Sequence, residues 1–388
     1  DTDGQARVEG NLDLDHFSLP AVLAGIYGIA REGDLALGET LWPQTEFSGS
    51  AFPLGSGEIR LSAKTADLGI GGRATGLRSL VKLAADGFEL SEAKAGWAGG
   101  TLAGEVSLTG EDSLGLRTRI EAEGIDLGEL AGIYRVPLAI SGKLKLSGGF
   151  DGIGKTPLAI AGAVGGEGVL SVTDGLVEGI RLQGLPSVLE AADAEGFEIV
   201  AQAVQQLVRD AFLAGETGFS ISDAPFAVSR GMFQMRNIVP QTGVKPEPSL
   251  DLALNLVEGT ASAMLTVAPD AGLEALEGAS TEFSVSAEGP VSEPSLAIAT
   301  APLEGFLSLR AFEREQRRVE ILQSAVLERQ RLRQDILRSE TRQRYVTAKL
   351  EEQRRQEEAE RERIRLEKEA EAERLRQQEA DRQRKLEE

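Results

Sequence analysis

The feature that most constrains this chain is the alternation of apolar and polar residues over short runs, each bounded by Gly, Asp or Pro. Successive side chains of a β-strand point to opposite faces, so this period of two predicts half-buried strands. The clear cases are Glu58–Ser62, Thr101–Leu108, Gly142–Leu146, Ser249–Leu256, Ala263–Val267, Phe283–Ala287 and Ser295–Ala299. Because successive strands are so close in the sequence, we expect antiparallel pairing.

Composition favours a repetitive body over a compact enzyme core. The 388 residues include 45 Gly, and only 5% of residues are aromatic, which is typical of many short strands joined by tight turns. A loose internal repeat supports this, because residues 117–133 echo residues 7–26 as strand, Gly, and short helix. The predicted fold is mainly β: an elongated, curved antiparallel sheet or groove of repeated units with short helices.

Three segments interrupt the strands with helical spacing. Residues 20–31 and 126–134 carry apolar residues at three- and four-residue steps and have Pro or Asp near the start, which predicts short helices. A larger helical region is predicted from Pro186 to about Leu213, divided in two at Gly196.

From Pro302 onward the pattern changes to that of a long helix. Apolar residues recur at three- or four-residue steps and then thin out after Leu350, where Glu, Arg and Gln dominate. We therefore predict a long charged helix, coiled-coil-like in its first half. The expected segments are a repetitive β-groove with short helices (1–183), a helical insertion (184–216), a C-terminal β segment (217–303) and the charged helix (304–388).

The net charge of −21 is unevenly distributed along the chain. The whole chain has 41 Lys and Arg and 62 Asp and Glu. Residues 304–388 hold 22 of the basic and 21 of the acidic residues, so residues 1–303 hold the other 19 basic and 41 acidic residues. The acidic body would be repelled by phosphate backbones, and the basic residues of the helix alternate with acidic ones. Nucleic acid is therefore not expected as a partner.

Residues that carry chemistry are scarce. The chain has no Cys and a single His, His16, so neither a Ser-His-Asp triad nor a multi-histidine metal site is expected. Residues 149–156 match the phosphate-loop pattern, but residues 157–166 are predicted to form strand and turn in place of the required helix. Acidic pairs such as Asp13 with Asp15 alternate with apolar residues, as on a solvated strand face. No enzymatic activity, cofactor or metal is expected.

The apolar strand faces remain as the candidate site. The candidate residues are Leu102, Val106, Leu108, Leu144, Leu146, Leu170, Val172, Leu250, Leu252, Leu254, Leu256, Phe283 and Val285. Alternation alone is compatible with an ordinary sandwich core and with an open groove that holds acyl chains. In a groove, each buried CH₂ group stabilises binding by about 0.8 kcal/mol.

Three segments resemble the AsmA-like family of envelope proteins. Residues 81–90 followed by 95–106 resemble the family's recurrent element, in which an aromatic residue and Gly-Gly precede a strand of Leu-x-Gly form. Residues 168–182 resemble its C-terminal hallmark of a strand, an Asp-Gly turn and Gly-Ile/Leu-Asp-Leu, with Arg181 where Asp is more usual. Residues 289–296 resemble the last strand. The resemblance covers about residues 1–312.

The resemblance implies a periplasmic protein that is similar to bridge-like lipid-transfer proteins. It implies binding or conduction of phospholipid acyl chains along an apolar groove, in support of outer-membrane lipid homeostasis or assembly. The chain opens in mid-pattern at residues 5–14, so we expect the inner-membrane anchor in an upstream segment. The alternative is a non-catalytic scaffold in outer-membrane protein assembly, which would recruit an envelope protein partner through helix 304–388.

Overall fold

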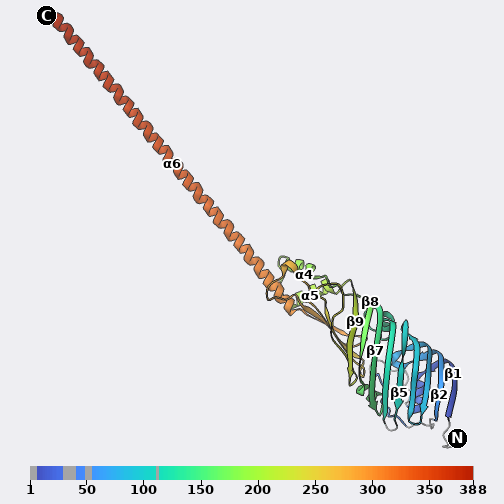
Figure 1. Cartoon of the computed structure of the whole chain (residues 1–388). Coiled ribbons are helices and arrows are strands. Elements are labelled where there is room, and N and C mark those ends of the chain that lie inside the picture. Colours follow the sequence, from blue (N-terminus) through green and yellow to red (C-terminus); the bar gives the residue numbers. More distant parts are fainter. Residues whose placement is uncertain (1–6, 29–40, 49–54, 111–112, 388) are drawn as a thin grey trace. The chain divides into compact units, whose positions relative to one another are not determined.

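The structure is a computed structural model that describes residues 7–28, 41–48, 55–110 and 113–387. The chain divides into two compact units, Asp1–Ala311 and Phe312–Glu388. The first unit is built on one 14-stranded sheet, open and curved, in which the spatial order of the strands follows the sequence (Figure 1). The predicted fold class is therefore confirmed. The expected β segments 1–183 and 217–303 both contribute strands to this single sheet.

The strands are β1 (Arg7–Ser18), β2 (Ser56–Asp67), β3 (Arg73–Ala84), β4 (Gly87–Trp97), β5 (Gly100–Thr109), β6 (Leu114–Asp126), β7 (Ile140–Gly154), β8 (Gly165–Glu178), β9 (Glu216–Ser229), β10 (Met232–Ile238), β11 (Ser249–Asn255), β12 (Thr260–Val267), β13 (Phe283–Pro290) and β14 (Ser295–Ala299). All seven strands predicted from alternation are confirmed. One pairing departs from the expected antiparallel pattern, because β1 runs parallel to β2. The connection between them, residues 19–55, is long enough for the crossover that parallel strands require.

The short helices begin where the sequence supplies caps. In α1 (Leu19–Tyr27) the Ser18 hydroxyl accepts a hydrogen bond from the Ala21 N–H, and in α2 (Leu127–Ile133) the Asp126 carboxylate accepts from two N–H groups. The predicted division at Gly196 is also confirmed, since α4 (Leu185–Ala192) and α5 (Ala201–Phe212) flank that residue.

The prediction of strand and turn for residues 157–166 was wrong for the first seven residues. Residues Pro157–Ala163 form the helix α3, because the Thr156 hydroxyl caps the Ala159 N–H and Pro157 occupies the first turn. The residues that match the phosphate-loop pattern nevertheless do not form a phosphate-binding loop. Residues 149–154 belong to β7, with Gly149 paired to Arg119 of β6 and to Glu167 of β8. Their backbone N–H groups are thus spread along a strand.

The prediction of an Asp-Gly turn at residues 174 and 175 is also wrong. β8 continues through both residues, and its register against β9 shifts between Val172 and Gly175. Asp174 has a φ of 51°, so the chain accommodates the extra residue as a bulge within a continuous strand.

Helices close the C-terminal end of the sheet. α4 and α5 pack with β12, β13 and the first turns of α6 (Ala301–Glu387) around fully buried apolar side chains. The buried members include Val188, Val204, Val208, Leu303 and Phe306. The segment between β12 and β13 contains the short helix η2 (Gly272–Glu274). The Thr281 hydroxyl at the end of this segment donates a hydrogen bond to Pro269 O at 2.5 Å. This end of the first unit is therefore a conventional hydrophobic core.

The second unit, Phe312–Glu388, is helical throughout its described part (Figure 1). Its apolar residues are exposed, including Phe312, Ile321 and Leu322, which are 66%, 68% and 57% exposed. Ion pairs along the helix join residues three or four apart, such as Glu313 with Arg317 at 3.0 Å. The long charged helix predicted for this region is confirmed.

Candidate functional site

The thirteen candidate residues all lie on one face of the sheet. Residues paired directly across strands share a face, so the face can be followed from strand to strand. Leu102 pairs with Ala122, Ala122 with Leu146, and Leu146 with Leu170. The sheet therefore brings strands β5 to β8 together into one continuous apolar surface.

The same face continues to the other candidates. Leu170 pairs with Ala224 of β9, and in the next strands Val228 pairs with Phe233 and Phe233 with Leu254. The β11 residues continue it to β12 and β13, where Leu265 pairs with both Leu250 and Val285. Leu256 follows the last residue of β11 and packs in the same cluster as Leu250 and Leu252. This surface, from β5 to β13, is the apolar face.

Burial along the apolar face is uneven. Leu108, Val172 and Phe283 are buried, at 9%, 5% and 2% exposure, whereas the other ten candidates are half-buried. Phe283 packs against Phe212 of α5 with ring centroids 4.6 Å apart, so it belongs to the helical core at the C-terminal end. Two of the half-buried candidates pack with helices, Val106 beside Tyr27 of α1 and Val285 against the C-terminal core, whereas six others share the cluster that spans β7 to β11.

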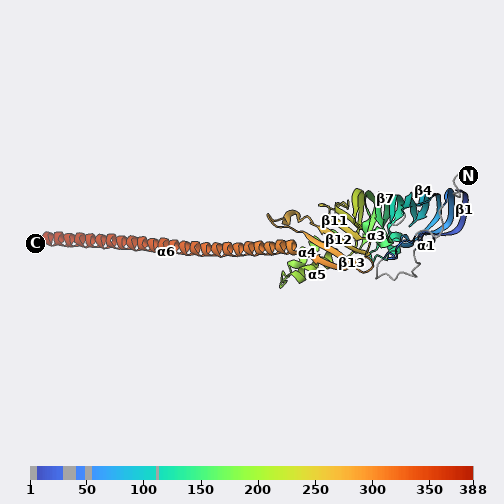
Figure 2. The same ribbon diagram turned by 90° about the horizontal axis from the view of Figure 1, so that it is seen from below.

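Two helices cover the N-terminal part of this face. α1 and α3 lie on the same side of the strands (Figure 2), and Tyr27 of α1 and Ile160 of α3 share a cluster with Phe88 and Leu108. The Tyr27 hydroxyl donates to Leu108 O at 3.2 Å. Burial, with a smaller effect of Asp86, raises the pKa of Tyr27 to about 12. This tyrosine is thus a structural contact that holds α1 on the sheet.

Residues 41–48 form a strap that sequence analysis missed. The Trp42 indole N–H donates to Leu256 O at 2.7 Å, and the Leu158 N–H donates to Pro43 O at 3.1 Å. At its other end, Ser48 N–H donates to Tyr27 O at 3.0 Å. The strap therefore links α1 and α3 to the end of β11. Trp42, one of only two Trp residues, was the available signal.

The β9 and β10 contribution to the apolar face was also missed. Phe226 packs against Phe150 and Phe233, with ring centroids 6.1 Å and 5.0 Å apart. Phe226 and Val228 alternate with polar or small residues in the sequence, so the signal was present. The bulge near Asp223, whose φ is 45°, interrupts the alternation before them.

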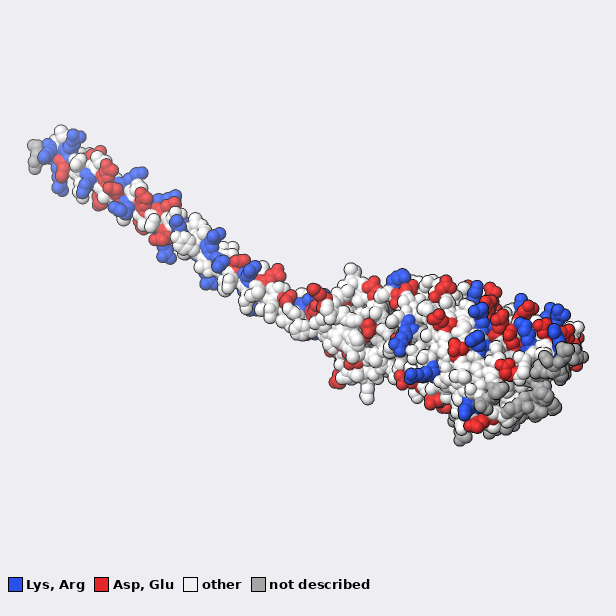
Figure 3. Space-filling view, turned by 60° about the horizontal axis from the view of Figure 1, so that its bottom comes forward, with Lys and Arg blue, Asp and Glu red and all other residues white. Residues whose placement is uncertain are grey.

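The opposite face of the sheet is polar. Glu105 pairs with Arg119, and Arg117 with Asp151, and side chains of both signs intermingle on the side shown in Figure 3. The acidic residues Asp13 and Asp15 are exposed, with Asp15 2.7 Å from Lys64. His16 is exposed as well and lies 3.1 Å from the Thr65 hydroxyl. These groups are arranged as a solvated strand face.

Shifted pKa values occur at caps and turns. A hydrogen bond from the Glu129 N–H, helped by Lys143, lowers the pKa of Asp126. Hydrogen bonds from the Thr242 hydroxyl and N–H lower the pKa of Glu247 to about 2. Within the described ranges, no group of three or more His, Cys, Asp or Glu is placed to hold a metal ion. These shifts therefore report local structure.

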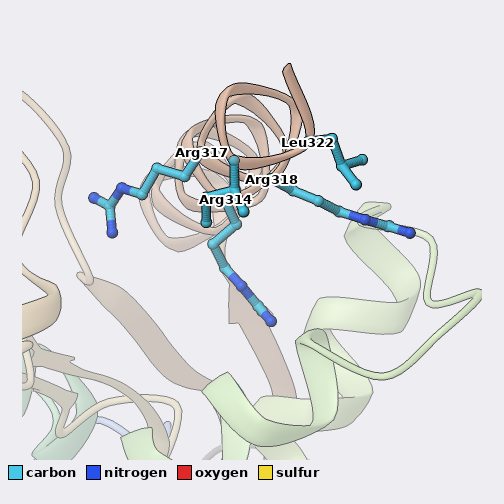
Figure 4. Close-up of a pocket in the computed structure, with 5 residues that line it drawn as sticks. Arg314, Arg317, Arg318 and Leu322 are labelled. Atoms are coloured by element: carbon cyan, nitrogen blue, oxygen red, sulfur yellow. The ribbon is translucent and has the colours of Figure 1, made fainter. Parts of the chain in front are cut away.

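Two surface hollows are open and shallow in character. One, of about 480 Å³, lies over β6 to β9 between outward-facing side chains such as Arg119, Glu121 and Glu167. The other, of about 310 Å³, is lined by residues of one helix, and Figure 4 shows Arg317 and Arg318 pointing in different directions. Neither gathers polar groups onto a common point, as a small-molecule site does.

Comparisons with protein-family models, with curated proteins and with solved structures give no match. Among the helices that the structure describes, none has both the length and the apolar character needed to cross a bilayer. The apolar face is thus the feature on which a functional proposal has to rest.

Proposed function

We propose that this chain binds the acyl chains of phospholipids along the apolar face. The observation that carries the proposal is that candidate residues from five strands share one face, and that ten of the thirteen are only half-buried. A sheet with one apolar face normally buries it against a second layer. Here helices and the strap cover its ends, while the middle keeps partly accessible aliphatic side chains.

The chemistry of the apolar face suits an acyl chain. It is lined by Leu, Val, Ile, Phe and Ala, and the charged residues of the paired strands point to the opposite face. Each CH₂ group of an acyl chain buried on this face would contribute about 0.8 kcal/mol. The polar headgroup would remain at the edge of the sheet in contact with water, and no covalent chemistry is involved.

The resemblance to the AsmA-like family gives this proposal a setting. It favours a periplasmic protein, attached to the inner membrane through an upstream segment, that supports lipid homeostasis or assembly at the outer membrane. This support comes from three sequence segments that occur in a consistent order. Direct measurement of bound lipid is therefore the decisive test.

Native mass spectrometry with lipid extraction tests the proposal on the full chain, purified from a bacterial host and freed of detergent. We expect co-purified phospholipid on the unaltered chain. Leu252→Asp and Leu254→Asp should reduce it, because they place carboxylates on the apolar face. Ala253→Asp is the matched control, because Ala253 lies between them on the same strand and points to the other face.

The outcomes separate an open groove from a closed core. Equal lipid loss in the Ala253→Asp control would indicate a general effect of added charge or unfolding, which circular dichroism would detect. A folded chain that carries no lipid after purification would contradict the proposal and make the apolar face a closed core.

The exposed apolar residues of the helical unit support a second candidate function, a scaffold that pairs through its helix. Val319, Leu322 and Val326 follow the three- and four-residue steps of a coiled-coil seam and are 41%, 57% and 55% exposed. Sedimentation equilibrium of the full chain should show an oligomer that Leu322→Ser and Val326→Ser dissociate. Ile321→Ser and Leu327→Ser, on other sides of the helix, are the controls. A monomer at micromolar concentration would contradict pairing of the helix with a second copy of the chain.

A further inference from the structure

A second apolar surface lies at the end of the sheet where β2 meets β3 and β6 meets β7. We call it the lip and define it as the short helix η1 (Gly69–Gly71) with the following residues Gly72 and Arg73, the helix α2 and residues 134–139. Four large apolar side chains of the lip are exposed: Ile70 at 43%, Ile133 at 36%, Tyr134 at 43% and Leu138 at 40%. Exposed apolar residues that gather in this way mark interaction sites.

Contacts hold the two halves of the lip together as one surface. A Cβ atom built on Gly72 would lie 3.3 Å from Ile133 Cγ2, so α2 reaches the turn that follows η1. The Trp97 indole N–H donates to Gly71 O at 2.7 Å, and the Asp126 N–H donates to Ala98 O at 2.8 Å. Residues at the turn between β4 and β5 therefore form hydrogen bonds with both halves of the lip.

The charge of the lip differs from that of the rest of the body. Residues 1–303 hold 41 acidic residues, but the stretches 68–85 and 130–150 contain none. Arg73 and Arg135 adjoin the exposed apolar residues, and neither forms an ion pair in the part of the chain that the structure describes. Arg135 stands at the turn after α2 with a φ of 54°.

Of the carboxylates at or near the lip, Asp67 and Asp126 are engaged in hydrogen bonds, Glu178 lies at the border and Glu129 lies within the lip. Asp67 accepts a hydrogen bond from the Gly69 N–H at 2.9 Å, and Asp126 caps α2 while pairing with Lys143 at 3.1 Å. Glu129 is exposed in the first turn of α2, and Glu178 adjoins Ala139 through a backbone hydrogen bond. The lip thus presents apolar side chains, two guanidinium groups and one exposed carboxylate, that of Glu129.

From this arrangement we infer that the lip contacts the surface of an anionic phospholipid bilayer, with Ile70, Ile133 and Leu138 entering the interface and Arg73 and Arg135 facing lipid phosphates. Aliphatic side chains bury themselves at the acyl boundary, and tyrosine favours the interface because one end of it is apolar and the other is wet. Arginine matches phosphate in charge and geometry. Charge complementarity between the two guanidinium groups and lipid phosphates, beside exposed aliphatic side chains, favours a bilayer as the occupant.

The lip is continuous with the apolar face. Leu130 of α2 packs against the cluster that contains Leu102, Leu144 and Leu146, while Ile133, three residues later on the same helix, is exposed. The inference rests on the proposed lipid-binding function, for which the lip would be the point of contact with lipid in a membrane. One short helix would then connect bilayer and sheet.

Vesicle flotation of the full chain tests the inference. We expect binding to vesicles of phosphatidylcholine and phosphatidylglycerol, weaker binding to phosphatidylcholine alone, and loss of binding as salt rises. Arg135→Glu should weaken partitioning about tenfold, since it reverses one charge near the surface. Arg230→Glu is the matched control, because Arg230 is also exposed with a φ of 51° but lies at the turn between β9 and β10, at the opposite end of the strands.

The apolar contribution has its own matched pair. Ile133→Ser with Leu138→Ser should also reduce partitioning about tenfold, because two aliphatic side chains no longer enter the interface. Ile153→Ser removes an aliphatic residue that is 62% exposed at the other end of β7, and it should leave partitioning unchanged.

Because the chain has no cysteine, a single introduced cysteine can carry a label that reports whether that position enters the bilayer. Leu138→Cys and Ile153→Cys can each be labelled with an environment-sensitive fluorophore. We expect the label at residue 138, and not the one at 153, to brighten and shift to shorter wavelength on anionic vesicles. Equal responses, or vesicle binding without a change at residue 138, would overturn the inference.

Failure of this inference can be told apart from failure of the proposed function. A chain that retains phospholipid in the mass spectrometer but does not float with vesicles would refute the lip contact alone. A chain that floats through the lip but carries no lipid would refute the acyl-binding face. Dimerisation in solution that Ile133→Ser abolishes, without vesicle binding, would assign the lip to a protein partner and overturn the inference.

Discussion

Arg310 of α6 donates to the carboxylate of Asp193, with Nη2 3.0 Å from Oδ2, and its Nε lies 2.9 Å from Glu274 Oε2. Arg310 is 9% exposed, and the side-chain hydrogen bonds with Asp193 raise its already high pKa. One guanidinium group therefore ties the first turns of α6 to the segment after α4 and to η2.

Replacing this guanidinium should loosen the C-terminal core. We expect Arg310→Met to lower the free energy of unfolding by about 2 kcal/mol, because it removes a nearly buried cation and its hydrogen bonds to two carboxylates. Chemical denaturation measures the change. Arg317→Met is the control: its pair with Glu313 is exposed, so the expected cost is below about 0.5 kcal/mol. Equal effects would mean that the buried position of Arg310 is unimportant.

The strap should depend on the indole hydrogen bond of Trp42. Trp42→Phe removes the donor to Leu256 O and should cost about 1 kcal/mol of stability. Hydrogen exchange gives a local readout, because the Leu158 N–H that bonds Pro43 O should exchange faster in the variant. Unchanged protection of Leu158 would show that the strap is held without the indole.

Glycine at position 168 should be required by the packing of the apolar face. A Cβ atom there would approach Ser147 O and the Phe226 ring far inside contact distance. We expect Gly168→Ala to cost about 2 kcal/mol, measured by thermal unfolding. At Gly149 the nearest atom would be 3.9 Å away, so Gly149→Ala should have little effect. Similar losses in both variants would contradict this account.

The Glu247 carboxylate should make the free energy of unfolding depend on pH in the acidic range. Its pKa is lowered from 4.5 to about 2, so the stabilising contribution is complete above about pH 4.5 and is lost as the pH falls toward about 2. Thr242→Val removes the hydroxyl donor and should raise the pKa of Glu247, measured by NMR titration. Thr242→Ser, which keeps the hydroxyl, should restore the low value. A pKa that does not respond to Thr242→Val would refute the hydrogen-bond cause.

Much of the secondary structure could be read from local pattern. Alternation located strands such as Ser249–Asn255, and Pro or Asp near helix starts located α1 and α2. The errors arose where local signals competed. Pro157 and Thr156 favoured α3, but a strand-like glycine-rich context masked them, and the Asp174–Gly175 pair that signals a turn elsewhere became a bulge within β8.

The sequence by itself determined the two-faced strands, the caps and the charged helix, because period, capping and charge are local properties that each segment carries alone. Only the tertiary structure decided that Leu102 and Val285, 183 positions apart, share one face, since register between strands depends on pairing across the whole sheet. It also decided that Trp42 reaches Leu256 and that Gly72 meets Ile133. Such contacts join segments whose local sequences carry no information about each other.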